Sequence, residues 1–136
     1  MNRNLVRLAA LAFIAFFITL IWIADRGEGS HWWAFIDRIP NGDKVGHVGL
    51  VGTLALLCNL AVRPRPSTRL TSLITLATLS LLVLLSLEEL SQAFIPTRTC
   101  DFFDWLADLA GLALGQFAAS KLRPRICAVS ESPEPT

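Results

Sequence analysis

Residues 5–24 read LVRLAALAFIAFFITLIWIA, a run of 20 residues in which Arg7 is the only charged side chain. A helix of about 20 apolar residues is long enough to cross a hydrocarbon core of about 30 Å. Three further apolar blocks follow, and with their polar ends they cover about residues 45–62, 70–95 and 102–122. Backbone amides in lipid must be hydrogen-bonded within their own segment, and no block alternates as a strand does. The sequence therefore predicts an all-α fold, a bundle of four transmembrane helices.

The composition excludes two broad classes of protein. Of the 136 residues, 53% are hydrophobic and 17% are charged, and the net charge is +1. A hydrophobic chain of this kind is not disordered, and its near-neutral charge argues against a nucleic-acid partner. We expect one membrane domain over residues 1–125 and a disordered, proline-broken cytoplasmic tail over residues 126–136. Within the long first loop, residues 32–36 are apolar but too short to span, and we expect them to rest on the bilayer surface.

The distribution of basic residues predicts the orientation. Eight of the 12 Lys and Arg residues flank the spans on one side, which the positive-inside rule places in the cytoplasm together with both termini. These eight are Arg3, Arg7, Arg63, Arg65, Arg69, Lys121, Arg123 and Arg125. Nine of the 11 acids and all four Trp residues fall on the opposite, outer side. The first span ends without a small-residue cleavage pattern, so we expect a retained helix rather than a signal peptide.

Polar residues recur at helical spacing near the outer ends of three spans. Residues three or four apart lie on one face of a helix, and the groups lie at similar depth. They are Asp43 and His47 in the second span, Glu88, Glu89 and Gln92 in the third, and Asp104 and Asp108 in the fourth. A carboxylate facing lipid at mid-bilayer costs about 2.5–3.5 kcal/mol, so these groups should face one another. We therefore expect a polar cavity between the second, third and fourth helices, with Glu89 and His47 both facing it.

Several neighbouring residues support such a cavity. Glycines that would allow close helix approach are Gly46, Gly49, Gly52, Gly111 and Gly115. Lys44 and Arg98 flank the expected mouth, where they either bind an anionic group of a substrate or neutralise the nearby acids. Asp101 stands where the N-cap of the fourth helix belongs.

These motifs resemble the VanZ-like family of small membrane proteins. The resemblance rests on Asp43-Lys44-x-x-His47, Glu88-Glu89-x-x-Gln92, Pro96-Thr97-Arg98-Thr99 and Asp104-x-x-x-Asp108-x-x-Gly111-x-x-x-Gly115, in this order. It implies a multi-pass protein of the bacterial cytoplasmic (inner) membrane with a role in glycopeptide resistance, low-level resistance to teicoplanin above all. The family often has Asn where this chain has Asp108, Asp where it has Glu88, and Gly where it has Thr97. The extra acid at position 108 predicts a cavity that binds a proton or a cation more tightly than its relatives do.

Three functions remain open from the sequence. The first is binding or processing of an amphiphilic cell-envelope molecule, such as a lipid-linked glycan or a lipoglycopeptide, that enters from the membrane lipid. The second is a proton-coupled transporter or proton relay, and the third is a non-catalytic partner in a membrane assembly. A divalent metal held by His47 with Glu89 and Asp104 or Asp108 is a further hypothesis, because imidazole and carboxylate ligands suit zinc or manganese. Whether a bond is made or broken stays open.

Overall fold

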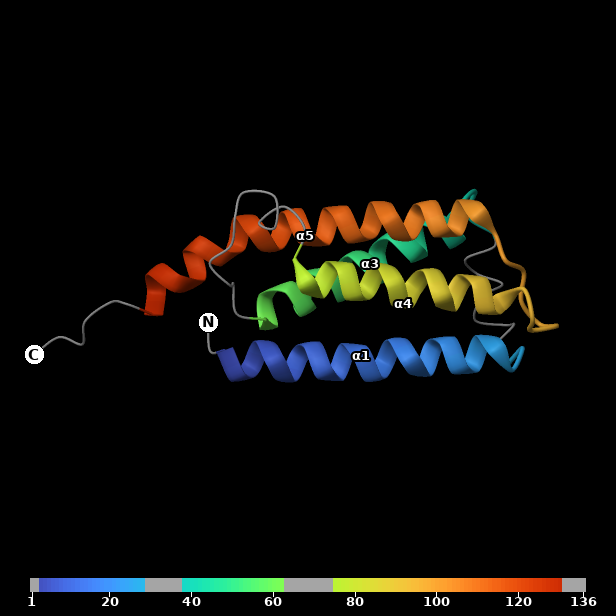
Figure 1. Ribbon diagram of the computed structural model, residues 1–136, viewed down its shortest axis with the longest axis horizontal. Helices are drawn as coiled ribbons and strands as arrows, with labels where there is room; N and C mark the ends of the chain where they lie inside the picture. Colours follow the sequence, from blue (N-terminus) through green and yellow to red (C-terminus); the bar gives the residue numbers. More distant parts are fainter. Residues whose placement is uncertain (1–2, 29–37, 63–74, 131–136) are drawn as a thin grey trace, which may run out of the picture.

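Figure 1 shows the computed structural model, which describes residues 3–28, 38–62 and 75–130. Over these ranges the regular elements are four α-helices: α1 (Arg3–Asp25), α3 (Gly42–Ala61), α4 (Leu76–Gln92) and α5 (Phe102–Ser130). Successive helices run in opposite directions, so Arg3 and Ser130 lie at the same end (Figure 1). The prediction of an all-α fold with four helices is confirmed. Two of them, α1 and α3, are long and apolar enough to cross a membrane.

Local sequence signals end α1 and begin α3. Gly27 adopts a φ of 67°, and Glu28 N–H donates to the carbonyl of Ile23 over 3.1 Å, which together form a Schellman cap on α1. Before α3, Asn41 takes the left-handed conformation with a φ of 56°, which Asn tolerates better than most side chains. Gly42 N–H donates to the carbonyl of Ile39 over 2.8 Å and closes the turn.

The ends of α4 and α5 differ in part from the prediction. The last helical residue of α4 is Gln92 rather than residue 95, because Pro96 disfavours the helical conformation in the residue before it. At the other end, α5 continues through Pro124 to Ser130, so residues 126–130 are helical where we expected a disordered tail. Proline removes one backbone donor and bends a helix, but it does not prevent the helix from continuing. Residues 70–74, 32–36 and 131–136 lie outside the described ranges.

Glycines hold α3 and α5 in close contact. A Cβ added at Gly111 would lie 2.9 Å from the carbonyl oxygen of Val48, and one at Gly115 would clash with the carbonyl oxygen of Gly52. The prediction of close approach is therefore confirmed for Gly52, Gly111 and Gly115. It is wrong for the other two glycines of α3, Gly46 and Gly49, because a Cβ at either position would meet nothing within 4 Å.

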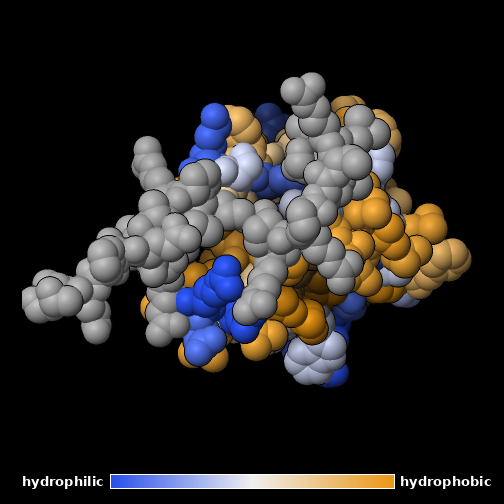
Figure 2. Space-filling model, turned by 60° about the vertical axis from the view of Figure 1, so that its left-hand side comes forward, coloured by the Kyte–Doolittle hydropathy of each residue, from blue (hydrophilic) through white to orange (hydrophobic). Residues whose placement is uncertain are grey.

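The apolar core lies between α3, α4 and α5, and α1 packs onto it from one side. Its central buried residues are Val51 and Ala55 of α3, Leu85 of α4 and Leu112 of α5, and Phe17 of α1 packs against them. α1 packs mainly against α3 and makes little contact with α4. Large hydrophobic side chains also cover the outside of the bundle, and Figure 2 shows a continuous patch of them along the flank at the right of the view.

A buried polar hub fixes the start of α4. Asn59 of α3 is 1% exposed and donates to Thr78 Oγ1 over 2.9 Å, and it accepts a hydrogen bond from the hydroxyl of Thr75, the N-cap of α4. Gln116 of α5 accepts from the backbone N–H of Thr75 over 3.4 Å. The hub therefore joins three helices. We did not predict this role, although Asn59 is a polar residue within an otherwise apolar run.

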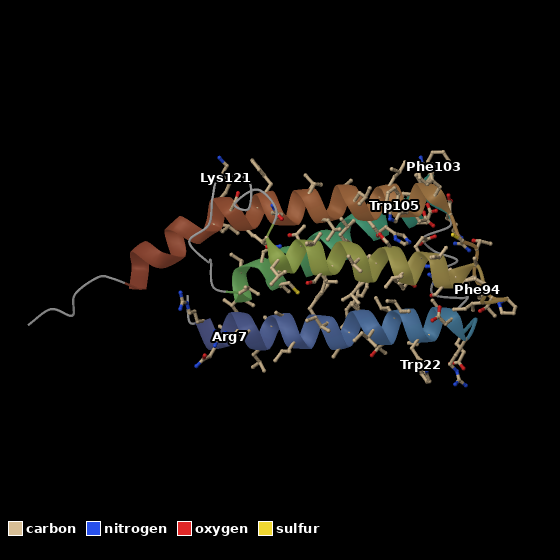
Figure 3. The ribbon with its side chains drawn as sticks, in the orientation of Figure 1. Arg7, Trp22, Phe94, Phe103, Trp105 and Lys121 are labelled. Atoms are coloured by element: carbon tan, nitrogen blue, oxygen red, sulfur yellow. The ribbon has the colours of Figure 1, made fainter. Side chains whose placement is uncertain are left out.

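The two ends of the bundle carry opposite charge. Every carboxylate of the described residues lies at the end where α1 finishes and α5 begins, which we call the acidic end: Asp25, Glu28, Asp43, Glu88, Glu89, Asp101, Asp104 and Asp108. Figure 3 shows Arg7 and Lys121 at the opposite, basic end, and Trp22, Phe94, Phe103 and Trp105 at the acidic end. Aromatic side chains of this kind are typical of a membrane interface.

Candidate functional site

Lys44 holds three aspartates together at the start of α3. Its Nζ lies 2.8 Å from Asp43 Oδ2, 2.9 Å from Asp104 Oδ1 and 3.3 Å from Asp101 Oδ2. Two of these carboxylates belong to the beginning of α5 and its N-cap, so the ammonium group connects the two helix starts. All three hydrogens of the ammonium group can be used by these contacts. Of the two roles predicted for Lys44, this geometry favours neutralisation of acids over binding of a substrate.

A histidine–aspartate pair lies one turn deeper. His47 of α3 and Asp108 of α5 are joined by a hydrogen bond of 2.9 Å between Nδ1 and Oδ1, and Asp108 is 2% exposed. On the other side of the imidazole ring, Nε2 lies 3.9 Å from Asp104 Oδ2. An ionised Asp108 requires a hydrogen on Nδ1, which leaves Nε2 as the nitrogen that gains or loses a proton. The ring therefore lies between two carboxylates, and Nε2 is the position where it can bind one further proton.

Asp101 caps α5 as predicted. Its Oδ1 accepts a hydrogen bond of 2.8 Å from the backbone N–H of Phe103, one of the amides that a helix start leaves without a partner. This hydrogen bond, together with the Lys44 ammonium, lowers the pKa of the Asp101 carboxyl below its ordinary value.

Glu88 and Glu89 of α4 have different surroundings although they are adjacent. Glu89 is 4% exposed, and its Oε1 accepts a hydrogen bond of 2.8 Å from the backbone N–H of Asp101. Gln92, which is 3% exposed, donates its amide group to Glu89 over 3.2 Å and to Glu88 over 3.1 Å. Adjacent helical residues point about 100° apart, so Glu88 is turned away from α5 and towards α1. Gln92 thus orients both carboxylates.

Arg98 connects the loop after α4 to the end of α1. Its Nη2 lies 3.8 Å from Glu88 Oε1, and its Nε lies 3.9 Å from Asp25 Oδ1. The neighbouring Thr97 hydroxyl donates to the carbonyl of Asp25 over 2.6 Å, and a Cβ at Gly27 would lie 3.0 Å from the Thr97 methyl group. These contacts attach the loop to the capped end of α1. Neither Asp25 nor Thr97 was predicted to take part in the site.

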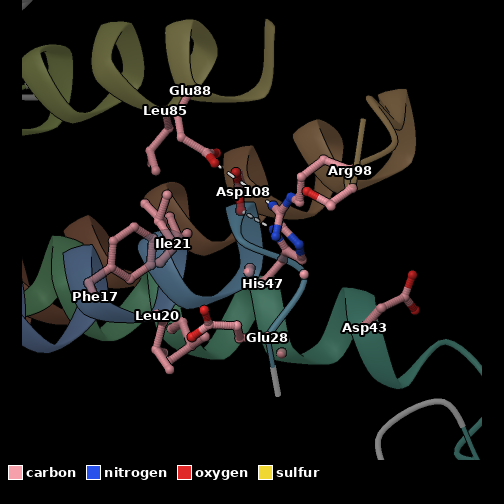
Figure 4. Close-up of a pocket in the computed structure, with 16 residues that line it drawn as sticks. Phe17, Leu20, Ile21, Glu28, Asp43, His47, Leu85, Glu88, Arg98 and Asp108 are labelled. Carbon is pink, nitrogen blue, oxygen red and sulfur yellow. Dashed lines mark hydrogen bonds and ion pairs between the residues drawn. The ribbon is translucent and has the colours of Figure 1, made fainter. Parts of the chain in front are cut away.

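A cleft of about 480 Å³ opens beside these groups, within the volume range usual for ligand sites. One end is apolar and the other is charged, as Figure 4 shows. The apolar end is lined by Phe17, Leu20, Ile21, Leu50, Val51 and Leu85, and the charged end by Glu28, Asp43, His47, Glu88, Arg98 and Asp108. Ala24, Gly27, Gly46 and Thr97 complete the lining.

The structure divides the predicted site residues into two groups. Asp43, His47, Glu88, Arg98 and Asp108 line the cleft, as expected. The remaining four predicted residues form the network behind it: Lys44, Glu89, Gln92 and Asp104. The prediction that Glu89 and His47 face one cavity is wrong for this cleft, because Glu89 is turned towards the N-terminus of α5.

The wall formed by α1 was also unexpected, since we placed the cavity between the other three helices. α1 supplies four of the 16 residues that line the cleft, and Gly27 and Glu28, just after its end, supply two more. Most of these side chains are apolar, and in the sequence they look like any lipid-facing segment. Only the charged residues at the end of the helix and just after it, Asp25, Arg26 and Glu28, could have indicated that this end of α1 meets a polar site.

The metal hypothesis gains no support from the geometry. In the part of the chain that the structure describes, no group of three or more His, Cys, Asp or Glu side chains is placed to hold a metal ion. The three candidate ligands point to different partners instead: His47 to Asp108, Glu89 to the backbone of Asp101, and Asp104 to Lys44.

Comparison with known proteins adds no relative to this description. No model of a protein family, no curated protein and no solved structure matches the chain.

Proposed function

We propose that this chain is a multi-pass protein of the bacterial cytoplasmic membrane, with both termini in the cytoplasm, whose cleft binds an amphiphilic molecule of the cell envelope. The observation that carries the proposal is the change along the cleft from apolar to charged lining residues. Its inner part, with Phe17, Leu20 and Ile21, suits an acyl chain, and its charged part with His47 and Glu88 suits a polar head group. Lipid-linked glycans and lipoglycopeptides have this chemistry.

The dimensions of the cleft agree with this class of ligand. Along α1, the lining residues extend from Phe17 to Ala24, which corresponds to about 10 Å of helix. Because α1 makes little contact with α4, the cleft lies along a weakly packed seam between these two helices. An amphiphile already in the membrane would enter through this seam, with its head group towards the acidic end.

The charge distribution supports the orientation. The basic end carries Arg3, Arg7 and Lys121, and a cytoplasmic position for it follows the positive-inside rule. The acidic end, with the cleft, then lies in the outer half of the membrane. There the cleft is open to envelope molecules of the outer leaflet.

The proposal is limited to binding. The His47–Asp108 pair could act as a general base, but the residues that line the cleft include no serine or cysteine, and the hydroxyl of the lining Thr97 donates to the carbonyl of Asp25 instead. A proton relay through the bundle is disfavoured, because the buried apolar cluster around Val51 and Leu112 separates the acidic end from the polar hub of Asn59. The resemblance to the VanZ-like family extends the proposal to a role in tolerance of lipoglycopeptides such as teicoplanin.

Native mass spectrometry of the full-length protein, extracted from membranes in lipid nanodiscs, tests the proposal. We expect a co-purified amphiphile of defined mass. Leu20→Trp would fill the cleft and abolish this adduct, whereas Leu11→Trp places the same ring on the exposed face of the same helix and should leave it unchanged. A folded wild-type protein without any adduct, or equal adducts in both variants, would contradict binding in the cleft.

A further inference from the structure

The acidic end carries more negative charge than its own cations balance. Eight carboxylates of the described residues lie there, together with four cations: Arg26, Arg38, Lys44 and Arg98. If all of these groups are ionised and His47 is neutral, four negative charges remain. In surroundings of low dielectric constant, such an excess strongly favours the uptake of positive charge.

The pairs at the rim of the cleft do not account for this excess. Glu28 pairs with Arg26 at 2.7 Å and Asp43 pairs with Lys44 at 2.8 Å, and the side chains of both acids are about half exposed. Each of these carboxylates has a close cation and contact with solvent. The unbalanced charge therefore lies on the other carboxylates of the acidic end, of which Glu88 and Asp108 line the cleft.

A single guanidinium group lies near two of these carboxylates, Glu88 in the cleft lining and Asp25 next to it. Arg98 lies 3.8 Å from Glu88 and 3.9 Å from Asp25, and both distances exceed that of a hydrogen bond. Asp25 Oδ1 is buried, and no described residue donates a hydrogen bond to it. A buried acceptor without a donor is costly, and this one lies next to the cleft lining rather than in it.

Asp108 is a second carboxylate with few partners, and unlike Asp25 it lines the cleft. Its Oδ1 is occupied by His47, but no described residue donates to its Oδ2, although the side chain is 97% buried and lines the cleft. An ionised carboxylate accepts hydrogen bonds only, and the cleft presents acceptors on Glu88 and Asp108 with one nearby cation, Arg98.

We propose that the molecule bound in the cleft is an amphiphile with a cationic, ammonium-type head group. This inference rests on the proposed function and specifies the head group that the same cleft selects. An ammonium group has three hydrogens to donate and a positive charge, so it supplies a close cation to Glu88 and a donor to Asp108 Oδ2, while its chain lies along Phe17 and Ile21. An anionic head group would meet four lining carboxylates and a single Arg.

The test compares head groups on one chain. The full-length protein in nanodiscs of zwitterionic phosphatidylcholine is titrated with tetradecylammonium, tetradecyl maltoside and tetradecyl phosphate, and occupancy is read by native mass spectrometry. We expect tetradecylammonium to bind at least tenfold more tightly than the other two. Ethylammonium, which has the head group without the chain, should bind at least tenfold more weakly than tetradecylammonium.

Variants locate the selectivity. Asp108→Asn and Glu88→Gln each remove one charge but keep an oxygen for the His47 or Gln92 hydrogen bond, and each should weaken tetradecylammonium binding about tenfold while leaving the maltoside unaffected. The matched control is Asp101→Asn, which removes a charge at the same end but outside the cleft lining and retains a capping side chain. It should change binding by less than twofold.

The outcomes separate this inference from the function on which it rests. Equal binding of the three tetradecyl compounds, abolished by Leu20→Trp, would keep the amphiphile site and overturn the cationic head group. Preference for the phosphate would also overturn it. Ethylammonium binding as tightly as tetradecylammonium would overturn an amphiphile as the occupant. If no compound bound to the folded protein, both the inference and the proposed function would fail.

Discussion

At the scale of single residues, the roles of Glu89 and Glu88 differ because a helix turns each residue towards a different neighbour. Glu89 is an internal connection: it accepts the backbone N–H of Asp101 and the amide of Gln92 and is almost fully buried. Glu88 belongs to the cleft. The sequence places both on one broad helical face and does not reveal this division, because it depends on where α5 begins.

A pair of substitutions at Glu89 tests the structural role. Glu89→Ala leaves the Asp101 N–H without an acceptor and removes one of the two acceptors of the Gln92 amide, and we expect it to lower the free energy of unfolding by about 1–3 kcal/mol. Glu89→Gln retains an oxygen for the Asp101 N–H and should cost less. Thermal unfolding of the purified protein measures both. Equal stability of wild type and Glu89→Ala would show that the buried hydrogen bonds contribute little.

The cap of α5 makes a prediction about pH. The pKa of Asp101 is lowered in the folded protein, so its carboxylate stabilises the fold above the pKa of the unfolded chain, and this contribution is lost as pH falls through the lower, folded value. Asp101→Asn keeps a cap but has no charge to lose. We therefore expect the difference in melting temperature between wild type and variant to be larger at pH 6 than at pH 3. A constant difference would mean that the charge is irrelevant to the cap.

At the scale of helices, the sequence predicts much of what the structure contains. Long apolar runs predict the four helices, and the spacing of Asp43 with His47 and of Asp104 with Asp108 predicts that α3 and α5 share a polar face. It does not predict the participation of α1, since apolar side chains such as Leu20 and Ile21 look the same whether they line a cleft or face lipid. The type of a residue shows whether its side chain is polar, but which neighbour that side chain contacts depends on how the helices pack.

Close contact between α3 and α5 makes glycine substitutions informative. Gly115→Ala inserts a methyl group against Gly52 and Ala55, and we expect overpacking to destabilise the protein by about 1–3 kcal/mol. Gly49→Ala is the matched control, because its Cβ would meet nothing within 4 Å and alanine favours a helix. Thermal unfolding should therefore give a lower melting temperature for the first variant and an unchanged or higher one for the second. Similar effects at both positions would show that the crossing of the helices tolerates a wider separation.

At the scale of the whole molecule, the proposed topology predicts where reagents reach the chain. Cys100 is exposed at the acidic end, in the loop between α4 and α5, whereas Cys127 belongs to the segment that we place in the cytoplasm. In intact spheroplasts, a membrane-impermeant maleimide should label a variant that retains only Cys100 and should not label one that retains only Cys127. Permeabilised cells provide the control for reactivity. The reverse pattern would invert the orientation and place the cleft on the cytoplasmic side.

The close contact between α3 and α5 at their glycines also makes some parts of the bundle stiffer than others. Backbone-to-backbone contact between α3 and α5 leaves no soft side-chain layer to compress, so this pair behaves as a stiff spine. α1 rests on α3 through side chains and is latched to the rest at one end, by the Thr97 hydroxyl on the carbonyl of Asp25. A tilt of α1 about that latch is thus the least costly deformation. Under the proposed function, the wall of the cleft would accommodate chains of different length, while the distance between His47 and Asp108 would stay fixed.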